Sequence, residues 1–275
     1  MRAPDHPPIP APEFPPDVEW LNAPFARVDK LMGRHAVLIE FWDFARINSL
    51  RTLPYTKAWH ERYADAGLAV LGVHSPGYSF GRDGATVGRA VERLEIGYPV
   101  ALDPDFEVWR AYGVRGWPAR YLFDRRGLLR WFHFGEGDYA GTECAIHEAL
   151  LEIDADLELP EPVDPLRPED APDVVLEAQT ADISLPADSE RLELVRDWLP
   201  GEDYLEAADA GGAATARYRN AGSAWAVLSE GGLEEPGLYE TDGTVVAEHP
   251  GLRLHGFQFT PDPATARPRP DGEPG

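Results

Sequence analysis

The chain has 275 residues, of which 43% are hydrophobic, enough for two domains that each bury a core. Its net charge of −23 is uneven, because residues 1–150 carry 20 acidic and 17 basic side chains whereas residues 151–275 carry 28 and 8. Such an acidic second half would repel nucleic acid and anionic membrane surfaces, so neither is expected as a partner. The single cysteine, Cys144, excludes an intramolecular disulfide.

The beginning of the chain shows no targeting pattern. Residues 1–16 are rich in proline and lack the apolar segment of a signal peptide, so we expect them to form a disordered lead. No run elsewhere approaches the ~20 apolar residues of a membrane span. We therefore expect a cytoplasmic protein without membrane insertion. A short helix is predicted over residues 25–32, ending before Gly33.

Alternating strand and helix patterns fill residues 17–156. The near-continuous apolar run 36–42 predicts a buried strand, and the amphipathic run 50–66, with Pro54 inside it, predicts a helix. Residues 68–74 predict a second buried strand. Further helices are predicted at 86–94, 106–112 and 138–153, and further strands at 98–102, 119–123 and 128–134. The order is βαβ, a helical insert, then ββα, which indicates an α/β domain.

Residues 157–275 show a different sequence pattern from the α/β domain. Residues 157–173 form an acidic, proline-rich stretch without periodicity, which we interpret as a linker that few contacts cross. Short alternating runs separated by glycine-rich turns follow in residues 174–261 and predict a small antiparallel β-sandwich. Residues 262–275 are expected to be a disordered tail.

The loop after the first predicted strand carries the most specific pattern. Phe41–Pro54 resembles the active-site segment of TlpA-like redoxins of the DipZ type, which have a thioredoxin fold and the motif Phe-Trp-Thr-Tyr-x-Cys-Ile-Asn-Cys-x-Arg-x-x-Pro. Arg46 and Ser49 stand where the two cysteines of the CxxC belong, so the motif is degenerate. The resemblance covers about residues 20–153. It implies a thioredoxin-like fold with the insert of TlpA-like and peroxiredoxin-like relatives.

The two replacements remove the redox chemistry that the motif serves. Dithiol exchange needs a thiolate, which a serine without an adjacent base cannot replace and an arginine cannot supply. Ser49 is therefore expected to cap the following helix. Glu40 matches the buried acid that serves the resolving cysteine in thioredoxins. With no thiol to serve, we interpret Glu40 as a carboxylate paired with an arginine.

The resemblance also places a cis-proline at Pro118, beside the motif loop, with Trp117 before it. Trp42, Arg46, Ser49, Trp117 and Pro118 would then line one groove that binds a protein or peptide. Trp42 has two interpretations, as a groove residue or as packing beneath the loop. Arg46 likewise either pairs with a nearby carboxylate such as Asp43 or holds an anionic group in the groove.

The leading hypothesis is a degenerate redoxin that serves as a non-catalytic binding or scaffold module in a thiol-redox context. An alternative is a thiol-disulfide oxidoreductase or peroxidase of the redoxin type that acts through Cys144 and an external thiol. Cys144 itself is expected to be a buried core thiol. The histidines show no metal-ligand spacing, and no metal or cofactor is expected.

A third hypothesis concerns the second domain. DipZ-type proteins carry a similar β domain that resembles carbohydrate-binding modules, and residues 251–260 resemble its last strand. Glycan binding would need exposed aromatic side chains on one face of the sandwich, although core packing is the expected use of such residues. The candidates are Trp198, Tyr204, Tyr218, Trp225 and Tyr239.

Overall fold

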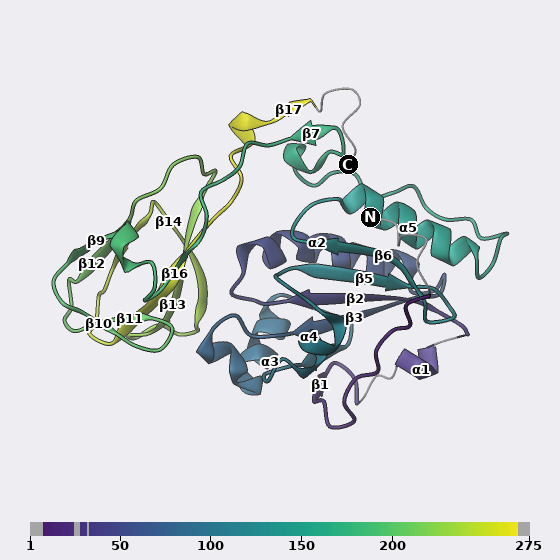
Figure 1. Cartoon of the computed structure of the whole chain (residues 1–275), viewed down its shortest axis with the longest axis horizontal. Helices are drawn as coiled ribbons and strands as arrows, with labels where there is room; N and C mark the ends of the chain where they lie inside the picture. The colour runs from purple at the N-terminus through teal and green to yellow at the C-terminus, as the bar shows by residue number, and fades with distance from the viewer. Residues whose placement is uncertain (1–7, 25–27, 32, 269–275) are drawn as a thin grey trace.

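The computed structural model describes residues 8–24, 28–31 and 33–268. Figure 1 shows two lobes, one built on a mixed sheet with helices and the other built of strands. We call residues 17–156 the N-terminal domain and residues 174–261 the β domain. The expected fold class, a thioredoxin-like α/β domain followed by an antiparallel β domain, is confirmed by the sheets described below.

The sheet of the N-terminal domain has the strand order β1-β4-β3-β2-β5-β6. Strands β2, β3 and β4 run parallel, and the remaining neighbours are antiparallel. This is the βαβ–insert–ββα order of the thioredoxin-like fold. The strands are β1 (Trp20–Leu21), β2 (Ala36–Trp42), β3 (Leu68–His74), β4 (Val100–Leu102), β5 (Ala119–Phe123) and β6 (Leu129–Phe134), and the helices are α1 (Val28–Leu31), α2 (Ile47–Tyr63), α3 (Gly84–Arg93), α4 (Glu107–Tyr112) and α5 (Tyr139–Leu151).

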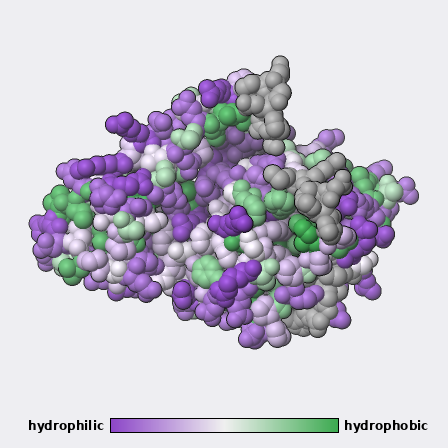
Figure 2. All heavy atoms as spheres, viewed as in Figure 1, coloured by the Kyte–Doolittle hydropathy of each residue, from purple (hydrophilic) through white to green (hydrophobic). Residues whose placement is uncertain are grey.

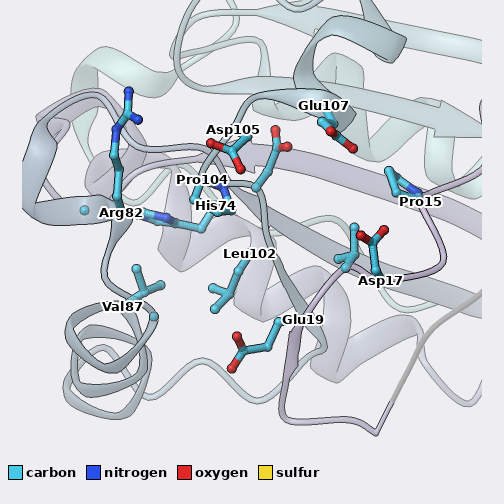
Figure 3. Close-up of a pocket in the computed structure, with 14 residues that line it drawn as sticks. Pro15, Asp17, Glu19, His74, Arg82, Val87, Leu102, Pro104, Asp105 and Glu107 are labelled. Atoms are coloured by element: carbon cyan, nitrogen blue, oxygen red, sulfur yellow. The ribbon is translucent and has the colours of Figure 1, made fainter.

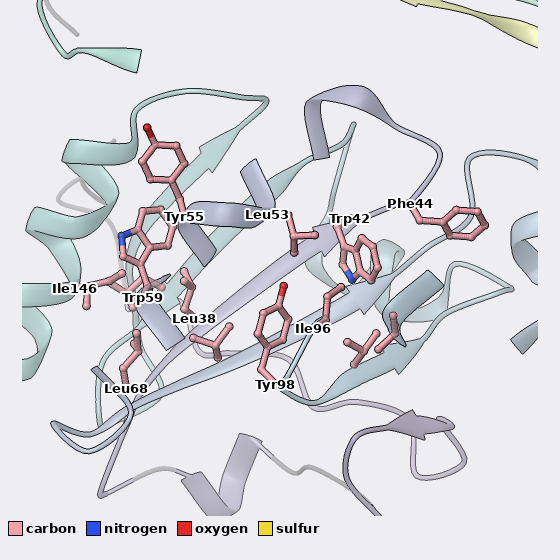
Figure 4. Packing of buried hydrophobic residues seen from close by; sticks show 14 of the residues in the cluster. Leu38, Trp42, Phe44, Leu53, Tyr55, Trp59, Leu68, Ile96, Tyr98 and Ile146 are labelled. Atoms are coloured by element: carbon pink, nitrogen blue, oxygen red, sulfur yellow. The ribbon is translucent and has the colours of Figure 1, made fainter. Parts of the chain in front are cut away.

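The two faces of this sheet bury different side chains because residues alternate along each strand. Leu38 and Trp42 of β2 join a core with α2, α3 and α5. Figure 4 shows this cluster, with Trp59 of α2 and Ile146 of α5 in it. Ile39 of β2 joins a second core on the opposite face, which α4 covers. Helices on both faces explain why β2 is buried along its whole length.

Two boundaries differ from the sequence-based expectation. Helix α2 begins at Ile47, three residues before the expected start, and buried Ile47 packs its side chain inward. The helix ends at Tyr63 and contains Pro54. The helix expected over residues 25–32 appears as α1, Val28–Leu31, while residues 25–27 and 32 lie outside the described residues.

Segments expected to be unstructured make specific contacts. Residues 8–16 of the expected lead run beside the turn before β6, with Pro10 bridging to Leu128 and Ala11 buried. At the other end, β17 (Arg267–Pro268) pairs with β7 (Val174–Val175). The parts of both termini beyond residues 8 and 268 lie outside the described residues.

The β domain consists of two antiparallel sheets that share one core. One has the order β10-β11-β16-β13-β14, with β8 also paired to β16, and the other has the order β15-β12-β9. Core side chains come from strands of both sheets, which therefore pack face to face. The strands are β8 (Ile183–Ser184), β9 (Leu192–Val195), β10 (Trp198–Pro200), β11 (Leu205–Ala207), β12 (Ala213–Ala216), β13 (Ala224–Glu230), β14 (Gly237–Thr241), β15 (Thr244–Val246) and β16 (Leu252–Phe259).

The surface of the chain is mainly polar. In Figure 2, hydrophilic residues cover most of the visible face of both domains, and apolar residues appear as separate patches. Among the described residues, no helix combines the length and the apolar character that crossing a membrane requires.

Candidate functional site

The motif loop, residues 43–49, joins the end of β2 to the start of α2. Arg46 is the N-cap residue of α2, with an extended backbone (φ −116°, ψ 115°) and no side-chain capping bond. Its side chain extends instead between two aromatic rings. The guanidinium carbon lies 4.6 Å from the centre of the Tyr78 ring and 4.8 Å from that of Trp117. Arg46 is thus held by cation–π contacts at the position of the first family cysteine.

Asp43 organises the loop beneath Arg46. It is buried, its Oδ1 accepts a hydrogen bond from the Ala45 amide (2.7 Å), and its Oδ2 accepts one from the Gly77 amide (2.5 Å). Burial alone would raise its pKa, but the His74 contact, the charge of Arg46 and the Ala45 amide hold that pKa below the usual value. Asp43 is therefore an anion that the loop encloses.

Position 77 can only be glycine while Asp43 and Arg46 keep these positions. A Cβ atom on Gly77 would lie 2.7 Å from Arg46 Nε and 2.7 Å from Asp43 Oδ2. Arg46 Nε is buried and has no hydrogen-bond partner among the described residues. The charge of Arg46 also lowers the pKa of Asp182 in the β domain, although burial, the larger effect, raises that pKa overall. Arg46 therefore interacts electrostatically with carboxylates of both domains.

The capping role expected for Ser49 is wrong. Ser49 is buried in the first turn of α2, and its Oγ accepts a hydrogen bond from the Asp43 amide at 3.3 Å. Because the helix starts earlier than expected, Arg46 rather than Ser49 occupies the cap. The hydroxyl at the second cysteine position ties the loop to the helix and is not open to solvent.

The peptide bond between Trp117 and Pro118 is cis, as the resemblance implies. Trp117 is half-buried, and its indole Nε1 donates a hydrogen bond to the Ser75 carbonyl at 2.9 Å. Its ring lies 4.5 Å from that of Trp109 on α4. The Pro118 carbonyl accepts a hydrogen bond from the Gly135 amide (2.7 Å). The structure thus brings Trp117 and Pro118 next to Arg46.

Trp42 is a core residue and does not line the groove. Its side chain is 1% exposed and packs edge-on against His74, in the cluster shown in Figure 4. Of its two interpretations, packing beneath the loop agrees with this placement. The other residues expected in the groove differ in exposure: Arg46 and Trp117 are half-buried and in contact with each other, whereas Ser49 and Pro118 are buried.

Glu40 is fully buried on the face of β2 that α2 covers, directly opposite Arg120 of β5. Burial raises the pKa of Glu40 to about 7, although Thr56, Arg120 and Tyr98 act in the opposite direction. Neither carboxylate oxygen has a hydrogen-bond partner among the described residues. The arginine expected beside Glu40 is present as Arg120, but the two are cross-strand neighbours without a hydrogen bond.

Cys144 is exposed, so the expected core thiol is wrong. The buried side of α5 includes Ala145, Ile146 and Ala149, which places Cys144 on the outer side of the helix with Glu148. Helix α5 packs on the sheet face opposite α4, which Trp117 contacts. Cys144, the only thiol of the chain, therefore faces outward from α5 and not toward the sheet.

The β domain supplies a residue that sequence reasoning missed. Gln258 of β16 is 1% exposed and makes all its side-chain hydrogen bonds to the N-terminal domain. Its Oε1 accepts from the Ile47 amide (2.7 Å), and its Nε2 donates to the Ala45 carbonyl (2.7 Å) and to the Tyr78 hydroxyl (3.2 Å). Between 180 and 213 positions separate Gln258 from these partners, and no local pattern signals such a contact.

Other side chains of the same β-domain face join this contact. Val227 of β13 belongs to the core of the N-terminal domain. Asp203 accepts hydrogen bonds from the amide and hydroxyl of Ser79 at 2.6 and 3.0 Å. His255 packs edge-on against Phe80, 4.9 Å between ring centres, and its Nε2 contacts the Ser229 hydroxyl at 2.9 Å. The two domains therefore meet at an interface that combines apolar packing with polar contacts, both buried and exposed.

The expected glycan-binding aromatics do not form an exposed platform. Trp198 is buried in the β-domain core, and Tyr218 and Tyr239 pack against that core. Tyr204 packs against His255 and the Arg253 guanidinium. Trp225 is half-buried and donates a hydrogen bond from its indole to Ser223 within the domain.

The linker is anchored along α2. Arg51 forms ion pairs with Glu136 (2.5 Å) and with Glu169 of the linker (3.1 Å). The Tyr55 hydroxyl donates to Asp170 (2.7 Å), and Arg167 pairs with Glu136 and Asp170. This network fixes residues 167–170 and contrasts with the few contacts expected of a linker.

A cleft of about 250 Å³ lies beside the carboxyl ends of β3 and β4 (Figure 3). Its wall carries several carboxylates together with His74 and Arg82. Asp103, one of those carboxylates, is already occupied by the amides of Val108 and Trp109 and by the Ser75 hydroxyl. Within the described ranges, no three acidic, histidine or cysteine side chains are arranged to hold a metal ion.

Comparison with known proteins agrees with this architecture. Residues 21–132 match the model of the AhpC/TSA family. The protein DipZ of Mycobacterium tuberculosis (strain CDC 1551 / Oshkosh) is 38% identical over 173 residues, which cover 62% of this chain and 25% of DipZ. The thiol-disulfide oxidoreductase YkuV of Bacillus subtilis (strain 168) is 28% identical over 145 residues, covering 53% of this chain and 97% of YkuV.

The solved structures include a thioredoxin-like protein in the oxidized form, which is 27% identical. It covers 53% of this chain and 97% of its own, with a TM-score of 0.48. The match to DipZ spans about a quarter of the length of that relative. The matched family model, the curated relatives and the sheet order lead to one conclusion: this chain carries a thioredoxin-fold redoxin domain of the TlpA/DipZ-like kind, joined to an antiparallel β domain.

Proposed function

We propose that this protein is a non-catalytic redoxin, a binding or scaffold module that does not perform dithiol exchange. The observation that carries the proposal is the chemistry of positions 46 and 49. Arg46 is held between two aromatic rings. Ser49 is buried, and its hydroxyl accepts a hydrogen bond from the Asp43 amide of the loop. Neither side chain supplies the thiolate that attacks a disulfide, nor the second thiol that resolves a mixed disulfide.

The recognition surface in this proposal is the groove at Arg46 and Trp117. In the family, the backbone beside the cis-proline pairs with a substrate peptide, and Trp117 and Pro118 keep that arrangement here. A half-buried tryptophan beside an arginine is typical of protein recognition surfaces. The ligand class that fits is a protein segment that pairs through its backbone beside Trp117 and Pro118. The similarity to thiol-disulfide oxidoreductases such as YkuV supports a thiol-redox context for this binding.

The experiment is to restore the thiols in the variant Arg46→Cys/Ser49→Cys and to compare it with the wild type in insulin reduction. We expect no activity from the wild type and measurable activity from the variant, because the helix N-terminus and cis-Pro118 are retained. A matched control is Arg46→Ser, which removes the guanidinium without adding a thiol. Wild-type activity at the level of the restored variant would contradict the proposal.

A second candidate function is favoured by one observation, the exposure of Cys144. An exposed thiol can react with an external disulfide to form a mixed disulfide, which a second, external thiol then resolves. This would be monothiol chemistry on the outer side of α5, separate from the motif loop. Cys144→Ser abolishes it and leaves the groove unchanged, so the two candidates are distinguishable.

A further inference from the structure

One face of the β domain contacts the motif loop of the N-terminal domain, here also called the redoxin domain, through Gln258. Figure 1 shows β13, β14 and β16 on the side of the β domain nearest the redoxin domain, and β9 and β12 on the far side. Along β13, Ala224, Ala226 and Leu228 point into the β-domain core, which leaves Val227 for the redoxin domain. The sheet that contains β13 and β16 is therefore buried on both faces where the domains meet.

Gln258 is the central polar residue of this contact. The side-chain amide offers one acceptor and two donors, and it pairs with backbone groups on both sides of Arg46, the Ala45 carbonyl and the Ile47 amide. The Ile47 amide belongs to the first turn of α2, whose N–H groups have no acceptor within the helix. Gln258 therefore binds the loop as a peptide group of a bound segment would.

We propose that the β domain is an intramolecular cap on the motif loop and that Gln258 is the residue that closes it. The capped protein leaves the Trp117 side of the groove partly open and covers the side at Tyr78 and the start of α2. A protein segment that pairs with the loop backbone must displace Gln258. This regulation rests on the binding function proposed above, but the cap itself can be tested without any ligand.

The contact made by Gln258 contributes to the stability of the closed arrangement, yet it is weak enough for the two domains to separate. A buried side-chain amide that loses its partners leaves unsatisfied groups on both domains, which is costly. The remaining polar contacts, such as the hydrogen bonds from Ser79 to Asp203, are exposed to solvent, where their net contribution is small. Loss of the Gln258 amide should therefore shift the equilibrium toward an open arrangement by about tenfold.

The test measures hydrogen exchange of the Ile47 amide in the full chain, in the wild type and in Gln258→Ala. We expect exchange at Ile47 to become about tenfold faster in the variant, whereas amides in the centre of β2 keep their rates. The matched control is Gln179→Ala. It removes a glutamine whose amide bonds the Phe259 carbonyl within the β domain, and it should leave Ile47 unchanged.

A second measurement keeps the test decisive if Gln258→Ala does not fold. In Val227→Cys/Cys144→Ser the only thiol lies in the interface, because Val227 of β13 is fully buried in the core of the N-terminal domain, and its alkylation by iodoacetamide reports opening. Adding Gln258→Glu, which keeps the size of the side chain but loses the N–H donors to the Ala45 carbonyl and the Tyr78 hydroxyl, should speed alkylation several-fold, and adding Gln179→Ala should not. Equal rates in all variants, by either measurement, would overturn the cap. Such a result would leave the absence of dithiol activity untouched, so failure of this inference is separate from failure of the proposed function.

Discussion

The Arg46 guanidinium lies 4.8 Å from the centre of the Trp117 ring, so a cation covers the residue that precedes the cis-proline. In a dithiol redoxin of this family, a cysteine would occupy position 46. Here a stacked arginine joins the motif loop to the cis-proline loop. The charge of Arg46 acts to lower the pKa of Asp43 in the loop and of Asp182 in the β domain.

The first prediction concerns this stacking. Arg46→Ala should lower the free energy of unfolding by about 1 kcal/mol, because two cation–π contacts are lost. Arg46→Lys should recover only part of the loss, since an ammonium lacks the planar face that stacks on Trp117. Urea unfolding measures both, with Arg115→Ala, an exposed arginine, as the control. A more stable Arg46→Ala protein would mean that relief at the helix N-terminus outweighs the stacking.

The same variant tests for an anion site. The thermal midpoint is measured with increasing sulfate or citrate, in the wild type and in Arg46→Ala. Because both rings already hold the guanidinium and two carboxylates lie near it, we expect equal, non-saturating shifts in the two proteins. A saturable stabilisation that disappears in Arg46→Ala would instead show an anion bound in the groove.

Glu40 should make stability depend on pH. Its folded-state pKa of about 7 lies above the usual value of 4.5, so the folded state binds the proton more tightly than the unfolded chain does. The stabilisation from this proton is complete below pH 4.5 and is lost as the pH rises through 7. Glu40→Gln should therefore gain stability relative to the wild type between pH 5 and 8, by up to roughly 3 kcal/mol.

The measurement for Glu40 is urea unfolding of both proteins across that range of pH. Asp124→Asn is a useful contrast, since hydrogen bonds and the Arg126 charge hold the pKa of Asp124 below its usual value, despite the opposing effect of burial. Its effect should have the opposite sign, with the variant less stable above pH 5. A constant difference between Glu40→Gln and the wild type at every pH would show that Glu40 does not titrate in this range.

The linker gives a fourth test. Arg51 holds it through Glu169, so Arg51→Ala should speed proteolytic cleavage within residues 164–171 several-fold. Arg89→Ala, which removes the exposed ion pair to Glu235 of the β domain, is the control and should leave cleavage there unchanged. Identical cleavage rates in Arg51→Ala and the wild type would mean that the network does not hold the linker.

Much of the fold follows from local patterns. The apolar run that became β2, the insert and the cis-proline at Pro118 are all visible in one stretch of sequence or in its resemblance to the family. The cap could not be predicted at Ser49, because a cap depends on where the helix starts, and the helix starts three residues earlier, which places Arg46 at the cap. The exposure of Cys144 could not be predicted either, because tertiary packing decides which face of α5 turns inward.

The contact between the domains could not be predicted in the same way. Gln258 lies in a strand whose alternation shows only that one of its faces is buried in the β domain. Its partners, the Ala45 carbonyl and the Ile47 amide, are backbone groups that any residue type presents. The sequence therefore does not indicate that this face contacts another domain. The way in which the two domains dock determines that Gln258 makes the contact to the motif loop.

The absence of dithiol exchange that we propose for this protein can be measured through the rate at which it reduces a fluorescent peptide disulfide. The assay uses excess glutathione as the external thiol, with the wild type and Cys144→Ser compared against glutathione alone. We predict that both proteins match the rate of glutathione alone. A rate above that background which survives Cys144→Ser would contradict the claim, and one that Cys144→Ser abolishes would identify monothiol chemistry at Cys144 as the activity.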